Sequence, residues 1–85
     1  MDYRRQSTED YFIRTNFYDL LPLATQISEE LGYDQEEMIE AICKVYEKYC
    51  KFPPSYNRTA WFATVFKEKL REGRSDILWF RAKYR

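Results

Sequence analysis

The chain has 85 residues, the length of one small domain, and its 14 basic and 14 acidic side chains give a net charge of zero. Aromatic residues make up 19% of the chain, which disfavours a disordered main body because disordered segments contain few of them. Two glycines and three prolines are too few for the many tight turns of a β-sandwich or barrel.

No apolar run approaches the roughly 20 residues that cross a bilayer, so no membrane contact is expected. The charged first residues are not followed by the apolar segment of a signal peptide, which favours a cytoplasmic protein.

The first half of the chain predicts two helices. Residues 1–6 are expected to form a flexible lead-in. Ser7 is a suitable N-cap for a helix over about 8–18, because acidic residues follow it in the first turn. A second helix is predicted over 21–31, with Gly32 placed directly after its end, where a left-handed residue commonly terminates a helix.

A third helix is predicted from the capping-box-like start at Asp34 to about Cys50. Its charged residues, including the pairs Glu36/Glu40 and Glu37/Glu40, are expected on a solvated face. Two cysteines seven residues apart on one helix lie ~10 Å from each other, too far for a disulfide, so both are expected to be reduced and buried. Helical spacing predicts one buried face made of Ile39, Ile42, Cys43, Tyr46, Tyr49 and Cys50.

A loop over 51–57 contains two prolines that end the third helix. A fourth helix is predicted over 58–72. Gly73 leaves two alternatives: a short fifth helix starts near Ser75, or one long helix runs to the end at a cost of ~1 kcal/mol relative to alanine. The residues expected to enter the core from the fourth helix are Trp61, Phe62, Val65, Phe66 and Leu70.

No stretch alternates apolar and polar residues as a strand does. The sequence therefore predicts an all-α protein, a compact bundle of four to five short helices in a single domain over 1–85.

Nothing in the sequence indicates catalysis. The chain has no histidine, which removes the commonest general base and a common metal ligand, and its cysteines form no C-x-x-C pair. Its two glycines lie too far apart for a phosphate-binding loop. We expect a non-enzymatic protein with no catalytic residue, metal or cofactor.

Charge is distributed unevenly along the chain. Residues 1–50 carry five basic and eleven acidic side chains, whereas residues 51–85 carry nine basic and three acidic ones. A basic helix face matches the phosphate backbone of a nucleic acid, so we expect DNA as a partner. The candidate nucleic-acid-binding residues are Arg58, Lys67, Arg71, Arg74, Arg81 and Lys83.

Three other interpretations of the charges remain open. The basic residues can be an ordinary solubilising surface, because acidic residues alternate with them over 67–72. The acidic third helix can neutralise the basic fourth helix within one chain. Two chains can also pair head to tail as a homodimer. Exposed aromatic residues favour a protein partner, and the candidates for that contact are Tyr56, Trp79 and Phe80.

Two short segments resemble known replication proteins. Phe52-Pro53-Pro54 after an amphipathic helix is similar to a turn in the small helical domain of phage helicase loaders. The run from Asn57 to Phe62, followed by Phe66, resembles aromatic helices near the ends of replication proteins from Gram-positive bacteria, their phages and plasmids. The resemblance covers about residues 39–80, and the ATP-binding segment of many helicase loaders is absent.

This resemblance implies a role in DNA replication, through DNA or through a helicase or initiator protein. Together with the basic last third, it makes an accessory protein of replication or gene control the leading expectation. A protein–protein interaction module or small inhibitor that uses exposed aromatic residues is the alternative.

Overall fold

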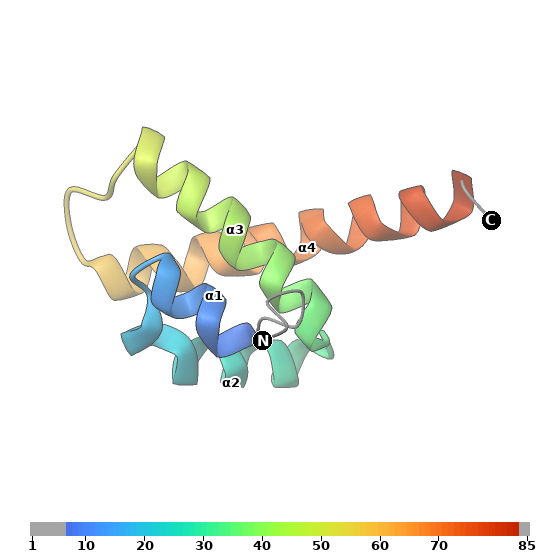
Figure 1. Cartoon of the computed structure of the whole chain (residues 1–85). Coiled ribbons are helices and arrows are strands. Elements are labelled where there is room, and N and C mark those ends of the chain that lie inside the picture. The colour runs from blue at the N-terminus through green and yellow to red at the C-terminus, as the bar shows by residue number, and fades with distance from the viewer. Residues whose placement is uncertain (1–6, 84–85) are drawn as a thin grey trace.

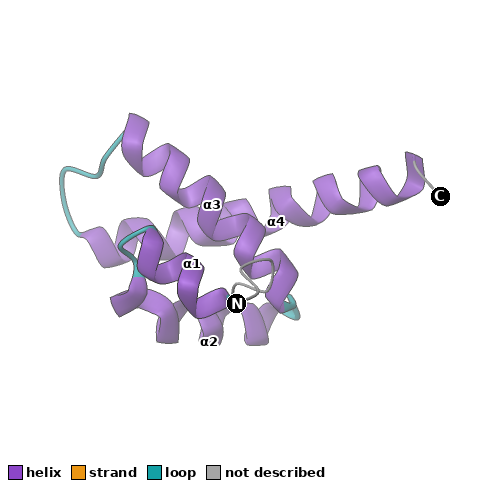
Figure 2. Ribbon diagram, in the orientation of Figure 1, coloured by secondary structure: helices purple, strands orange, loops and turns teal. Residues whose placement is uncertain are grey.

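The computed structural model describes residues 7–83 of the chain, with side chains described as far as Trp79. The expected lead-in over 1–6 and the side chains of Phe80, Arg81 and Lys83 lie outside the described residues. The elements are α1 (Thr8–Arg14), the short 3-10 helix η2 (Tyr18–Leu20), α2 (Leu21–Leu31), α3 (Gln35–Lys51) and α4 (Arg58–Lys83). Within the described part of the chain there is no strand, and Figure 2 shows helices joined by short loops. The prediction of an all-α bundle is therefore confirmed.

Two helices begin at the caps that the sequence predicts. Ser7 Oγ accepts a hydrogen bond from the Asp10 amide at 3.2 Å, and the Asp10 carboxylate accepts one from the Ser7 amide. Asp34 and Glu37 make the same reciprocal pair at 2.8 and 2.9 Å. Each box satisfies two amides at a helix start that have no partner within the helix.

The predicted extent of α1 is wrong, because the helix ends at Arg14 instead of continuing to residue 18. Asn16 adopts a left-handed conformation with φ 66°, which asparagine tolerates better than most residues. The Thr15 hydroxyl donates to the Tyr11 carbonyl at 2.9 Å and so helps to close the last turn. This reversal directs Phe17 into the core, where its side chain is fully enclosed.

The predicted bounds of α2 are confirmed, and Gly32 ends the helix with φ 78°. Ala24 and Ile27 are the apolar residues that α2 buries, whereas Leu31 is half exposed.

The buried face of α3 differs from the prediction. Met38, Ala41, Ile42 and Val45 enter the core, whereas Cys43, Tyr46 and Cys50 are exposed. The prediction that both cysteines are buried is therefore wrong. Ile42 is buried as predicted, but the prediction overlooked Met38, Ala41 and Val45. A small side chain such as Ala41 suits a close contact between helices.

Gly73 does not interrupt α4, which runs unbroken to Lys83. A Cβ atom at this position would lie 3.1 Å from Cγ and 3.3 Å from Cβ of Glu40 on α3. The glycine therefore lets α3 cross α4 at close range, and this contact accounts for a residue that costs ~1 kcal/mol inside a helix. Of the two alternatives left open by the sequence, the single long helix is correct.

The core is built on stacked phenylalanines. The rings of Phe62 and Phe66 on α4 lie parallel, with centroids 5.2 Å apart, and Phe12 meets Phe66 edge-on at 6.3 Å. Phe17 packs against Phe62 at 5.2 Å. All five residues predicted to enter the core from the fourth helix are buried, so that prediction is confirmed.

α4 is longer than the bundle that surrounds it. Figure 1 shows α1, α2 and α3 grouped around the earlier part of α4, while its last turns project away from the other helices. The buried positions of α4 step along one face through Phe62, Phe66, Leu70 and Gly73, and the half-buried Ile77 continues that face. Beyond it, Leu78 and Trp79 are 56% and 62% exposed. We call residues 77–83 the α4 extension.

We expect Phe62→Ala to lower the free energy of unfolding by about 3–5 kcal/mol, because it opens a cavity among packed rings. Phe52→Ala is the matched control, since Phe52 is 68% exposed, and it should change stability by less than about 0.5 kcal/mol. Urea unfolding followed by circular dichroism measures both. Equal effects of the two substitutions would contradict the core described above.

Candidate functional site

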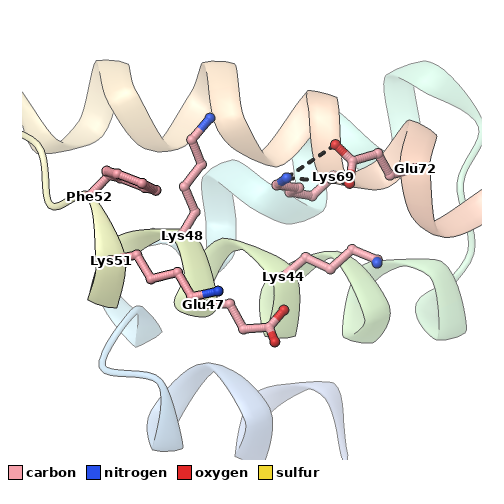
Figure 3. Close-up of a pocket in the computed structure, with 7 residues that line it drawn as sticks. All are labelled: Lys44, Glu47, Lys48, Lys51, Phe52, Lys69 and Glu72. Atoms are coloured by element: carbon pink, nitrogen blue, oxygen red, sulfur yellow. Dashed lines mark hydrogen bonds and ion pairs between the residues drawn. The ribbon is translucent and has the colours of Figure 1, made fainter.

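A groove with several lysines runs between α3 and α4 and encloses about 310 Å³. Figure 3 shows the seven residues that line it, most of them from α3. They are Lys44, Glu47, Lys48, Lys51, Phe52, Lys69 and Glu72. We call it the α3–α4 groove.

Lys44, Lys48 and Lys51 share one face of α3 because they are spaced four and three residues apart. The predicted sites did not include this row, because acidic side chains outnumber lysines over 34–50. The spacing of the three lysines was the signal that could have revealed it.

Most cations of the α3–α4 groove are already paired with carboxylates of α4. Lys44 Nζ lies 3.0 Å from Asp76 Oδ2, and this hydrogen bond raises the pKa of Lys44. Lys48 Nζ lies 3.4 Å from Glu68 Oε1. Lys69 contacts the carboxylates of Glu68 and Glu72, as the dashed lines to Glu72 in Figure 3 show. These partly exposed pairs each contribute modestly to stability. The Lys44 and Lys48 pairs join α3 to α4, whereas the Lys69 pairs lie within α4.

Lys51 lies in the same groove without an ion pair among the described residues. One unpaired lysine beside three paired ones gives weak attraction for an anion. The groove therefore serves mainly to hold the two helices together.

Arg58, a predicted nucleic-acid contact, is engaged within the protein. Its guanidinium donates to Asp19 Oδ2 at 2.8 Å and to the Asn16 carbonyl at 2.7 Å. It also lies over the Phe17 ring at 4.7 Å, a cation–π distance. Arg58 thus fastens the start of α4 to the turn after α1.

Arg74 is engaged in the same way at the other end of the bundle. It donates to both carboxylate oxygens of Glu37, donates to the Gly32 carbonyl at 2.9 Å, and lies 4.1 Å over the Tyr33 ring. Glu37 is only 8% exposed, so its expected place on a solvated face is wrong. The Arg74 hydrogen bond holds the pKa of Glu37 below its ordinary value of 4.5.

Lys67 and Arg71 are the predicted basic residues that the structure leaves exposed. They are four residues apart and share one face of α4. Neither makes an ion pair or side-chain hydrogen bond with the residues described here. Among the predicted basic residues whose side chains are described, Lys67 and Arg71 are therefore the pair that lies together and free at the surface.

The predicted aromatic contacts do not form one patch. Tyr56 is 71% exposed in the loop before α4, and Trp79 lies in the α4 extension. The helix between them rises 1.5 Å per residue, which separates them by about 30 Å. Tyr56 and Trp79 therefore belong to two separate surfaces of this protein.

The exposed Cys43 is a poor nucleophile in this setting. Partial burial raises the pKa of its thiol, and the charges of Glu40 and Glu47 raise it further. The thiolate is the reactive form, so these surroundings favour the unreactive thiol. Among the described residues, no group of histidine, cysteine, aspartate and glutamate side chains is arranged to hold a metal ion.

Over residues 7–83, no helix combines the length and the apolar character that crossing a membrane requires. No protein-family model, no curated protein and no solved structure matches this chain. The class that fold and surface define is a small all-α bundle with one projecting helix.

The Arg74–Glu37 pair predicts a specific pH dependence. Because the folded-state pKa of Glu37 is lowered, the stabilisation is complete above the ordinary value and is lost as the pH falls through the folded-state pKa. The free energy of unfolding should therefore decrease from about pH 5 towards pH 2. Glu37→Gln should lower it by about 1–3 kcal/mol at neutral pH and flatten this decrease.

The control is Glu47→Gln, which changes a carboxylate on the same helix that makes no ion pair with the described residues. It should leave the pH profile measured by chemical denaturation unchanged. Parallel profiles for the Glu37→Gln and wild-type proteins would contradict the role given to this pair.

Proposed function

We propose that this chain is a non-enzymatic protein-binding module that docks its partner through the α4 extension. The observation that carries the proposal is the projection of a regular helix beyond the bundle, which Figure 1 shows. Its last described side chains, Leu78 and Trp79, are large, apolar and exposed. An apolar helix inserted in a groove is a common mode of protein recognition.

Leu78 and Trp79 are consecutive and exposed, and the half-buried Ile77 precedes them. Apolar side chains gathered at one exposed point commonly mark a contact with another molecule. Tryptophan in particular is enriched among the residues that dominate binding energy. These three residues define the apolar part of the docking surface.

The sequence after Trp79 adds positive charge, with Arg81, Lys83 and Arg85 at the end of the chain. Charges at the edge of an interface mainly accelerate encounter and exclude partners of the same sign. The proposal therefore favours a partner with an apolar groove and acidic residues beside it.

The Leu78→Ala/Trp79→Ala protein should lose at least tenfold in affinity for such a partner, because these side chains supply most of the apolar contact. Its unfolding midpoint should match that of the wild type, since both residues lie outside the core. Proteins captured by immobilised wild-type chain at stoichiometric yield are identified first, and titration calorimetry then measures the affinity of each variant.

Tyr56→Ala is the matched control, because it removes an equally exposed aromatic ring far from the extension. It should bind as the wild type does. Full binding by the Leu78→Ala/Trp79→Ala protein would rule out the α4 extension as the docking element. Light scattering against concentration shows whether the partner is a second copy of this chain.

Nucleic-acid binding is the second candidate, and the exposed Lys67/Arg71 pair favours it. Two cations on one helix face can contact successive phosphates and release counterions. Arg58 and Arg74 contribute less than the sequence suggested, since both are held by carboxylates and carbonyls of the first half. A role in DNA replication or gene control stays a prediction.

If DNA binds here, the Lys67→Ala/Arg71→Ala protein should bind it less tightly than wild type at low salt and with a salt dependence smaller by about two counterions. Fluorescence anisotropy with labelled DNA measures both quantities. Lys69→Ala is the control, because that lysine is held by neighbouring carboxylates. No binding by the wild type at about 20 mM salt, where phosphate contacts are strongest, would eliminate this candidate.

A further inference from the structure

The loop that joins α3 to α4 lies at the opposite end of the molecule from the α4 extension (Figure 1). Phe52 and Tyr56 are 68% and 71% exposed, and Pro53 and Ser55 between them are exposed as well. The Tyr56 side chain makes no hydrogen bond or ring contact with the described residues. These apolar side chains therefore contribute little to the packing of the bundle. We call residues 52–57 the proline loop.

Two consecutive prolines set the backbone of the proline loop. A proline fixes its own φ at about −65° and disfavours the helical conformation at the residue before it. Pro53 is constrained in both ways, because Pro54 follows it, and these constraints favour the extended polyproline II conformation. The structure agrees, since Phe52 ends α3 with φ −137° and residues 53 and 54 belong to no helix or turn.

Both ends of the proline loop are fixed by hydrogen bonds. The Phe52 amide donates to the Lys48 carbonyl at 2.7 Å, at the end of α3. The Asn57 side chain caps α4, where its Oδ1 accepts from the Ala60 amide at 3.0 Å. Because the prolines and these bonds already restrict the chain, a partner that binds the loop loses little affinity to ordering it.

The exposed part of the loop reads Pro53-Pro54-Ser55-Tyr56, which is the pattern Pro-Pro-x-Tyr. Polyproline II segments bind small domains whose grooves are lined with aromatic rings, and WW domains that select Pro-Pro-x-Tyr are one class of them. We propose that the proline loop is a docking site for a WW-type domain. The proline pair enters the aromatic groove, and the exposed Tyr56 ring fills a pocket beside it.

The tyrosine distinguishes this partner from other domains that recognise polyproline II segments. SH3 domains select prolines three residues apart, in the pattern Pro-x-x-Pro, and the residue three after Pro53 is Tyr56. The third proline of the chain, Pro22, lies in the first turn of α2. The proline loop is separate from the α4 extension, so either proposal can fail without the other.

The test uses the full chain and an isolated WW domain of the class that binds Pro-Pro-x-Tyr peptides, with binding followed by amide chemical shifts. Saturable binding with Kd on the order of 100 μM is expected, with the largest shifts at the end of α3 and the start of α4. The same domain with its groove aromatic residues replaced by alanine should not bind. Absence of saturable binding at about 1 mM domain, or equal binding of the altered domain, overturns the proposal.

Two substitutions in the loop separate recognition from general adhesion of exposed rings. Tyr56→Ala should weaken WW binding about tenfold or more, because it removes the ring that fills the pocket. Phe52→Ala is the matched control, since it removes an equally exposed ring outside the Pro-Pro-x-Tyr pattern, and it should bind as the wild type does. Both variants should keep the wild-type Tm, because neither ring lies in the core. If the two variants bind alike, the proposal is wrong.

Two further measurements place the contact. Leu78→Ala/Trp79→Ala should bind the WW domain with wild-type affinity, and a loss in this variant would overturn the assignment to the proline loop. An SH3 domain that binds Pro-x-x-Pro peptides should not bind the chain. Equal affinity for the SH3 domain would show that Tyr56 does not select the partner and would also overturn the proposal.

Discussion

The close crossing of α3 over the middle of α4 is the contact on which the rest of this structure depends. Gly73 lets the helices approach, Phe62 and Phe66 fill the space on the core side, and lysine–carboxylate pairs border the α3–α4 groove. Because apolar packing and ion pairs act between the same two helices, α4 is fixed from its first turn as far as Asp76. From this anchored part, α4 continues as a regular helix beyond the bundle.

The sequence was most informative where a local interaction decides the outcome. The Ser7 and Asp34 caps, the Gly32 terminator and the aromatic core face of α4 all follow from neighbouring residues in the chain, and the structure has them as predicted. The predictions failed where contacts between segments distant in the chain decide which side chains are buried. The face that α3 buries is chosen by its neighbours, and Glu37 is buried because Arg74, 37 residues later, satisfies its charge.

The same limit applies to the candidate sites. Sequence alone groups Arg58, Arg74, Lys67 and Arg71 as one basic set. The fold shows that Arg58 and Arg74 form hydrogen bonds with carboxylates of the same chain. The −6 and +6 halves of the chain are therefore partly balanced within the molecule, and the pairs run in both directions between acidic and basic segments. A cavity of about 480 Å³ that residues of α1, α2 and α3 line had no signal in the sequence, because its lining comes from three separate helices.

The two tryptophans of this chain stand on one helix in opposite surroundings. Trp61 is 8% exposed and meets the Tyr49 ring at 5.8 Å, whereas Trp79 is 62% exposed in the α4 extension. The emission of an indole shifts to shorter wavelength as water is excluded from it. The molecule thus carries two built-in optical reporters: the signal of Trp61 follows the integrity of the bundle, and that of Trp79 follows occupation of the projecting helix.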